Sequence, residues 1–138
     1  LIKTGAPTEA AAAFKEAINL DPTLAKAHLN LGVYHAQNGR FDDALTSVTE
    51  AATISPDYFE AWLTQAQLHN VAGRHEETQK SAEKAWLLNK ASADALYLQA
   101  HSLSQLGRKS EAAELLPTLR GIAPARAAQI ESSLRDDL

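Results

Sequence analysis

The stretch NGRFDDAL, residues 38–45, has the composition of a helix end, a tight turn and a new helix start. Gly39 suits the left-handed conformation that ends many helices, and the aspartates after Arg40 suit a first helical turn. The same Gly-Arg dipeptide returns at Gly73 and at Gly107, each 34 residues after the one before. A fixed period of this length indicates tandem structural repeats, and we expect positive φ at all three glycines.

Proline and alanine recur with the same period. Their columns are Pro22, Pro56 and Pro124; Ala10, Ala44 and Ala112; and Ala17, Ala51 and Ala85. Within each row the apolar residues follow helical spacing, and the alternation typical of strands is missing. Each row is therefore predicted to form helix A, a turn, helix B and a second turn. Small residues such as Gly32, facing Ala44, should let the two helices of a pair cross closely.

This pattern resembles the tetratricopeptide repeat, a 34-residue helix pair with preferred Trp, Leu-Gly, Tyr, Ala, Phe, Ala and Pro positions. The matching residues are Leu31, Gly32, Ala44, Ala51 and Pro56 in one row, Trp62 and Ala85 in the next, and Ala112 and Pro124 in the third. His28, His35 and Val48 stand where the family prefers aromatic residues. The resemblance implies an all-α fold, a right-handed α-solenoid of tandem 34-residue helix-turn-helix repeats with a C-terminal capping helix.

The rows divide the chain into a single array. We expect a partial repeat at 1–24, full repeats at 25–58, 59–92 and 93–126, and a capping helix at 127–138. The partial repeat should contribute only helix B, about Pro7–Leu20, because too few residues precede Gly5 to form a helix. Pro117 falls inside the last helix B, so we expect a kink or a split helix there. Because the chain lacks Met and begins at Leu1, we expect it to be a portion of a longer protein.

Composition and charge exclude several partners. The 138 residues carry a formal net charge of −4, and the 13 Lys and Arg residues are scattered along the chain. A nucleic-acid binder would show a basic face, so no nucleic acid is expected as a partner. No apolar run reaches transmembrane length, so direct membrane insertion is not expected either. The absence of Cys leaves both cytoplasm and periplasm open as compartments.

No motif for catalysis, a metal or a cofactor stands out, and the chain is expected to be non-catalytic. The HExxH, GxSxG and P-loop patterns are absent. His35 and His69 occupy corresponding positions of successive rows, which stacked helix pairs keep roughly 10 Å apart, too far to share a metal. We interpret both, and His28, as imidazoles packed between helices. His75 follows a turn and is expected to be solvated.

In proteins similar to this one, helix A lines a concave face that binds partners. The residues at groove-facing places are Lys26, Asn30, Val33 and Gln37 in the first row, Glu60, Thr64 and Gln67 in the second, and Asp94, Tyr97, His101 and Gln105 in the third. Their side-chain amides suit the backbone of an extended peptide, and Tyr97 suits an apolar anchor. The two-carboxylate clamp that binds acidic chaperone tails is not expected. Its basic and amide places hold Leu29, Val33, Thr64, Asp94 and Leu98.

Two kinds of function remain open. One is a protein–protein interaction scaffold that binds a peptide or partner segment in the concave groove. The alternative is an accessory or oligomerisation array of a larger enzyme or of an envelope export or assembly protein. Helix B of the partial repeat lacks its own helix A, so its apolar side needs a cover. We therefore also expect self-association through the N-terminal end, near Phe14.

Overall fold

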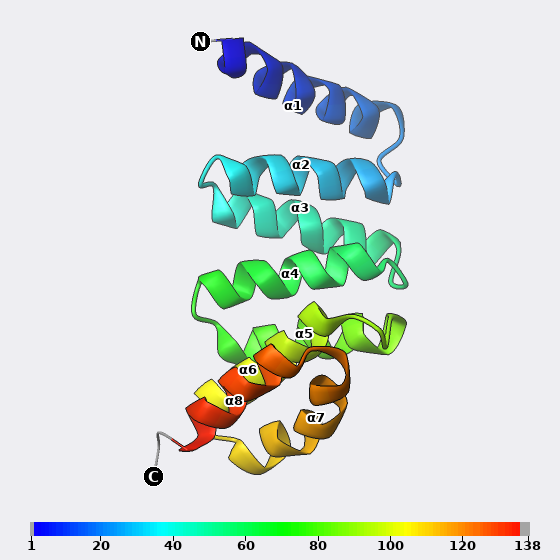
Figure 1. Cartoon of the computed structure of the whole chain (residues 1–138). Coiled ribbons are helices and arrows are strands. Elements are labelled where there is room, and N and C mark those ends of the chain that lie inside the picture. Colours follow the sequence, from blue (N-terminus) through cyan, green and yellow to red (C-terminus); the bar gives the residue numbers. More distant parts are fainter. Residues whose placement is uncertain (1, 136–138) are drawn as a thin grey trace.

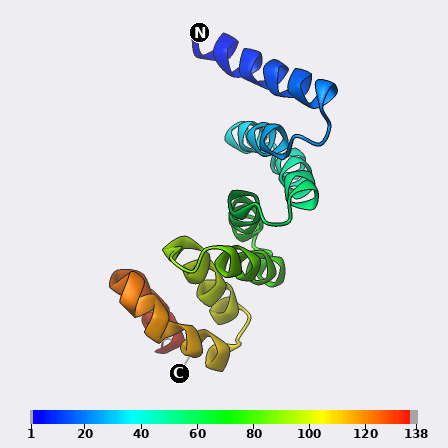
Figure 2. The same ribbon diagram turned by 90° about the vertical axis from the view of Figure 1, so that its right-hand side faces the viewer.

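The computed structural model describes the backbone of residues 2–135 and the side chains of residues 9–135, which form a stack of eight helices and no strand. The helices are α1 (Ile2–Leu20), α2 (Ala25–Gln37), α3 (Phe41–Ile54), α4 (Phe59–Val71), α5 (His75–Leu88), α6 (Ala93–Gln105), α7 (Lys109–Ile122) and α8 (Pro124–Arg135). The two ends of the chain lie at opposite ends of the stack (Figure 1). The turned view shows the helices descending as a staircase (Figure 2). The fold is an all-α solenoid.

The even-numbered helices form a continuous stack. Helix α2 packs on α4, α4 on α6, and α6 on α8, and each helix also packs on its neighbours in sequence. Within residues 2–135, no two odd-numbered helices pack on each other. Consecutive odd-numbered helices are therefore separated. Side chains from these helices, and from the even-numbered helix between them, lie in the space that separates them.

Three glycines end helices α2, α4 and α6 in the same way. The φ angle is 74° at Gly39, 74° at Gly73 and 76° at Gly107, which confirms the predicted positive φ. In each turn the next residue, an arginine, donates its backbone N–H to a carbonyl at the end of the helix, at 2.9 Å. This is a Schellman motif. A Cβ built on any of the three glycines would meet nothing within 4 Å, so the backbone angle and not crowding selects glycine.

Helices α2 and α3 cross at a point where only glycine fits. A Cβ on Gly32 would lie 2.5 Å from Cγ2 of Val48 and 3.0 Å from the backbone oxygen of Ala44. This confirms the expected close crossing in the first helix pair. The corresponding residues of the next two pairs, Ala66 and Ala100, are fully buried, so there the helices leave room for a methyl group.

The core is distributed along the stack. One cluster joins α2, α3 and α4 around Val48, and another joins α6, α7 and α8 around Leu96 and Ile130. A smaller cluster with Ala66 and Leu98 lies between them. Because each cluster involves only neighbouring helices, the stability of the fold is a sum of local contributions.

Two local expectations about helices need correction: the start of the first helix, and the split at Pro117, whose alternative, a kink, stays a prediction. Helix α1 runs from Ile2 through Gly5 and Pro7 to Leu20, so it begins before the predicted start at about Pro7. A single glycine costs a helix only about 1 kcal/mol and does not by itself specify a turn. Pro117 does not split α7, which is continuous from Lys109 to Ile122. Pro117 is exposed while Leu116 and Leu119 are buried, so core packing on the other side stabilises the helix despite the missing backbone bond.

Leu1, at the start of the predicted partial repeat, and residues 136–138, at the end of the predicted capping helix, lie outside the described residues. Pro22 and Pro56 lie in the short turns before α2 and α4. Pro124 is the first residue of α8, where its missing N–H would have no helical partner in any case.

Candidate protein-binding site

The eleven predicted groove residues all lie on even-numbered helices. Lys26, Val33, Gln37, Glu60, Gln67, Asp94 and Gln105 are exposed, and Asn30, Thr64, Tyr97 and His101 are half-buried. Their spacing along each helix puts them on one side of it. Helices α2, α4 and α6 pack on one another in order, so the three rows of residues follow one another along the stack. We refer to these eleven residues as the even-helix face.

The C-terminal helix α8 contacts the third row of this face. A guanidinium nitrogen of Arg126 lies 2.5 Å from a carboxylate oxygen of Asp94, and the guanidinium lies 5.2 Å from the centre of the Tyr97 ring. The hydroxyls of Ser104 and Ser133 are 2.9 Å apart. Tyr97 also packs against the core cluster of α6, α7 and α8. Contacts within the chain therefore already use the residue that the sequence suggested as an anchor for a partner.

His101 links the even-helix face to α5. Its ring stacks on Tyr97 with 5.7 Å between ring centres, and it meets the edge of His75 at 6.1 Å. His75 is half-buried and its Nδ1 has no hydrogen-bond partner among the described residues, so the expectation that it is solvated is wrong. The turn after Gly73 points this side chain at α6 instead of into water. Burial, together with the neighbouring His75, lowers the pKa of His101.

His28 and Trp62 make the same bond to the preceding turn. Nε2 of His28 lies 2.9 Å from the carbonyl oxygen of Pro22, and Nε1 of Trp62 donates to the carbonyl oxygen of Pro56 at 2.7 Å. The imidazole thus reproduces the polar contact of the indole in the same column. In the third row the corresponding residue is Leu96, which is buried and has no polar side-chain atom.

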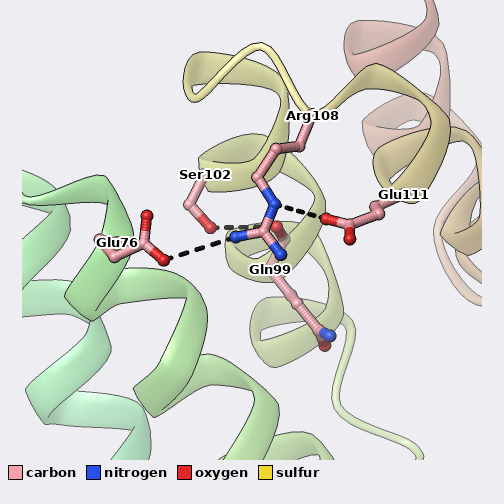
Figure 3. A network of polar contacts seen from close by, with 5 residues as sticks. All are labelled: Glu76, Gln99, Ser102, Arg108 and Glu111. Carbon is pink, nitrogen blue, oxygen red and sulfur yellow. Dashed lines mark hydrogen bonds and ion pairs between the residues drawn. The ribbon is translucent and has the colours of Figure 1, made fainter.

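The arginine of the Gly-Arg turn connects one repeat to the preceding one. Arg74 lies 3.9 Å from Asp42 and Arg108 lies 3.4 Å from Glu76, each pair joining a turn to the start of the preceding odd-numbered helix. Arg108 also donates to Glu111 at 2.5 Å (Figure 3). That hydrogen bond and the nearby carboxylates raise the pKa of Arg108. The dipeptide therefore has two structural roles, since glycine closes the helix and arginine pairs with the neighbouring repeat.

Three pockets lie away from the even-helix face, along the odd-numbered helices. The first, of about 450 Å³, is lined by α1, α2 and α3; the second, of about 200 Å³, by α4 and α5. The third, of about 280 Å³, is lined by α5, α6 and α7. Their lining residues correspond at the 34-residue period, for example Leu31, Gln65 and Gln99. Sequence reasoning missed these pockets because they depend on how consecutive repeats stack.

Neither a metal site nor a membrane-spanning helix is found among the described residues. No three His, Asp or Glu side chains among them come together as a metal site requires. None of the helices in the described part of the chain is long and apolar enough to cross a bilayer.

Known families and structures correspond to this architecture. A tetratricopeptide-repeat family model matches residues 1–59, and the same turn geometry continues through Gly73 and Gly107. Residues 1–59 thus match the tetratricopeptide-repeat family. No curated protein matches it in sequence.

Solved structures are similar to the tetratricopeptide-repeat fold of nearly the whole chain. A crystal structure of MamA has a TM-score of 0.79 and 18% sequence identity, and the match covers 97% of this chain and 90% of that one. A tetratricopeptide repeat protein from Parabacteroides merdae has a TM-score of 0.84 and 20% identity, covering 96% of this chain and 54% of that one. At these identities the similarity concerns the fold. The family match of residues 1–59 and the repeat fold support a general role as a scaffold for protein–protein interaction.

Proposed function

We propose that this chain is a non-catalytic scaffold that binds a peptide or an extended partner segment on the even-helix face, chiefly across α2 and α4. The observation that supports this most is the combination of polar amides and exposed valines on these two helices. Asn30, Gln37 and Gln67 are exposed or half-buried. Val33 is 36% exposed, and Val71, at the end of α4, is 68% exposed.

These residues suit an extended partner for a physical reason. Each side-chain amide offers both donors and an acceptor, so it can pair with the N–H and C=O groups of a peptide backbone. The valines supply apolar contact beside them. Because the residues stand on packed helices, little ordering entropy is lost on binding. Row three contributes less to this proposal, since α8 already contacts Asp94 and Tyr97.

Site-specific photo-cross-linking tests this proposal. A benzophenone amino acid is placed at Gln37 or Gln67, and at Lys15 on α1 as the control outside the even-helix face. We expect Gln37 and Gln67 to cross-link the same partner in cell extract, and Lys15 to cross-link none. Adding Asn30→Arg should abolish the cross-link at unchanged melting temperature, because a large cation then blocks the groove. Cross-links from Lys15 alone would contradict the proposal.

A second candidate function, self-association, is favoured by the packing of α1. In the described part of the chain α1 packs only on α2, whereas α3, α5 and α7 each pack on two helices. Leu20, at its end, is 79% exposed, and Phe14 is half-buried. We infer that a second copy covers the free side of α1. This arrangement suits an oligomerisation or accessory array of a larger enzyme or of an envelope export or assembly protein.

Light scattering at rising protein concentration tests self-association. The wild-type chain should increase in mean mass with concentration, and Phe14→Glu should remain monomeric because it places a charge on the contact. Glu16→Gln, on an exposed side of the same helix, should behave as the wild type. A wild-type chain that stays monomeric at every concentration would rule out a contact through α1.

A further inference from the structure

Helix α5 carries two lysines and two exposed leucines on one side. Lys80, Lys84, Leu87 and Leu88 lie within an arc of about 100° around the helix, because successive residues are rotated by about 100°. Leu87 is 62% exposed and Leu88 is 42% exposed, and both lysines are exposed. We call these four residues the α5 stripe. The described part of the chain leaves this stripe open to a partner.

The α5 stripe departs from the repeat pattern. The corresponding places hold Ala12, Glu16, Asn19 and Leu20 in α1, Thr46, Glu50, Thr53 and Ile54 in α3, and Glu114, Thr118, Gly121 and Ile122 in α7. The last place is apolar in all four helices, so Leu88 belongs to the repeat. The two lysines, and a large apolar residue at the third place, occur in α5 alone. The repeat fold therefore does not require Lys80, Lys84 or Leu87.

A tryptophan on α4 holds one of the two cations in place. Nζ of Lys84 lies 4.3 Å from the centre of the Trp62 ring. That ring is fixed in turn, because its Nε1 donates to the carbonyl oxygen of Pro56 at 2.7 Å. The face of an aromatic ring attracts a cation, and the ammonium group keeps N–H donors for other acceptors. Lys84 is therefore oriented while its donors remain available.

The positive charges of the stripe lack acidic partners within the chain. Both lysines line the second pocket together with one carboxylate, that of Glu77. No carboxylate of the described residues lies within ion-pair distance of Lys80 or Lys84. This local excess of positive charge occurs on a chain whose net charge is −4. Electrostatic complementarity therefore favours an anionic partner at this place.

The length and order of the stripe specify the partner further. Lys80 and Leu88 are about 12 Å apart along the helix axis, which corresponds to about two helical turns. An amphipathic helix can present carboxylates and apolar side chains in one row over this length. Glu77, about one turn before Lys80, repels a carboxylate at that end. Carboxylates of the partner therefore suit the two lysines, and its apolar side chains suit Leu87 and Leu88.

We propose that the α5 stripe docks an acidic amphipathic helix of a partner protein. The carboxylates of that helix accept hydrogen bonds from Lys80 and Lys84, and its apolar side chains cover Leu87 and Leu88. An anionic bilayer is a poorer occupant, because it is recognised by clusters of about four to eight basic residues. The α5 stripe shares no residue with the even-helix face, so this surface is separate from the proposed groove.

Fluorescence anisotropy with designed helices tests the proposal. The probe is a labelled, lactam-bridged peptide of about 15 residues, with two Glu and two Leu in one row at the spacing of the stripe. It should bind the wild-type protein saturably. One control peptide has Gln in place of Glu, and the other has Ala in place of Leu. Each should bind at least about tenfold more weakly, because each loses half of the contact.

Variants of the stripe locate the binding. Lys80→Gln combined with Lys84→Gln should weaken binding of the acidic probe about tenfold at unchanged helicity. Leu87→Thr, which installs the residue type found at this place in α3, should weaken it to a similar extent. Lys15→Gln removes an exposed lysine from α1 and is the matched control, which should bind as the wild type. Asn30→Arg, on the even-helix face, should also bind as the wild type.

Several results would overturn the proposal. These are equal binding of the Gln peptide, and undiminished binding of the acidic probe in both variants of the stripe. Loss of binding in Asn30→Arg would place the probe in the groove instead of on α5. Binding to phosphatidylserine vesicles that both stripe variants abolish, without binding to the acidic probe, would assign the stripe to a membrane surface.

Discussion

At the residue scale, the glycines that end α2, α4 and α6 are selected by one backbone angle. Gly73 has φ of 74° and open space where a Cβ would stand. Gly73→Ala should lower the free energy of unfolding by about 1 kcal/mol, because an L side chain in the left-handed region carries a penalty of that order. Urea denaturation of the two proteins measures the difference.

Gly121 in α7 provides the matched control for this prediction. A Cβ there also meets nothing within 4 Å, but its φ lies outside the left-handed region. Gly121→Ala should therefore raise the free energy of unfolding, by up to about 1 kcal/mol, because alanine favours the helix. If both variants lost the same stability, the turn conformation would not be the cause.

Also at the residue scale, His101 should make stability depend on pH. Burial, then the charge of His75, lowers its pKa in the fold below the ordinary value of 6.5. The folded state therefore binds this proton less readily than the unfolded state, and stability is lost as pH falls below about 6.5. The urea concentration at the unfolding midpoint should decrease as the pH is lowered from about 7.5 to about 5.5.

His101→Phe isolates this contribution, because phenylalanine keeps an aromatic ring against Tyr97 but does not titrate. The pH dependence should become shallower in this variant. Some dependence should remain, because burial lowers the pKa of His69 in the same direction. A urea midpoint that stays constant over this pH range in the wild type would contradict the assignment.

At the element scale, the contact between α2 and α3 depends on Gly32. A Cβ there would meet Cγ2 of Val48 at 2.5 Å and the backbone oxygen of Ala44 at 3.0 Å. Gly32→Ala should lower the free energy of unfolding by about 1–3 kcal/mol, as overpacked cores do. Combining it with Val48→Ala, which removes one of the two clashes, should cost less than the sum of the single changes. Additive losses in the double variant would mean that the two side chains do not compete for the same space.

At the scale of the whole molecule, the free energy of local opening should differ from helix to helix, and it should be larger for a helix that packs on more neighbours. Helix α4 packs on α2, α3, α5 and α6, whereas α1 packs on α2 among the described residues. In an array held by nearest-neighbour contacts, the less supported end opens first. Amide hydrogen exchange should therefore be fastest in α1 and slow in α4. Equal protection of the two helices at low protein concentration would contradict this order.

Exchange in α1 also bears on assembly. If a second copy covers the free side of α1, its protection should increase with protein concentration, and Phe14→Glu should remove that increase. The protection of α4 should not change with concentration in either protein. The comparison within one molecule separates local opening of α1 from unfolding of the whole array.

The sequence alone determined the helix pairs and their turns. The 34-residue period of the Gly-Arg turns and the alanine columns predicted α2 to α7 and the positive φ of Gly39, Gly73 and Gly107. These features are predictable because a turn depends on the backbone preferences of a few adjacent residues. Where such local signals are ambiguous, prediction was less accurate: α1 begins at Ile2, before the predicted start at about Pro7, and Pro117 does not split α7.

Only the tertiary structure decided which polar side chains have partners. Arg126 reaches Asp94, and His75 reaches His101, only because consecutive helices stack at a particular offset. The buried oxygen of Gln99 is left without a donor for the same reason, since its potential partners come from helices on either side of α6. Whether a buried group is satisfied depends on the side chains that packing brings within hydrogen-bonding distance, and a repeat pattern read along one chain does not specify those distances.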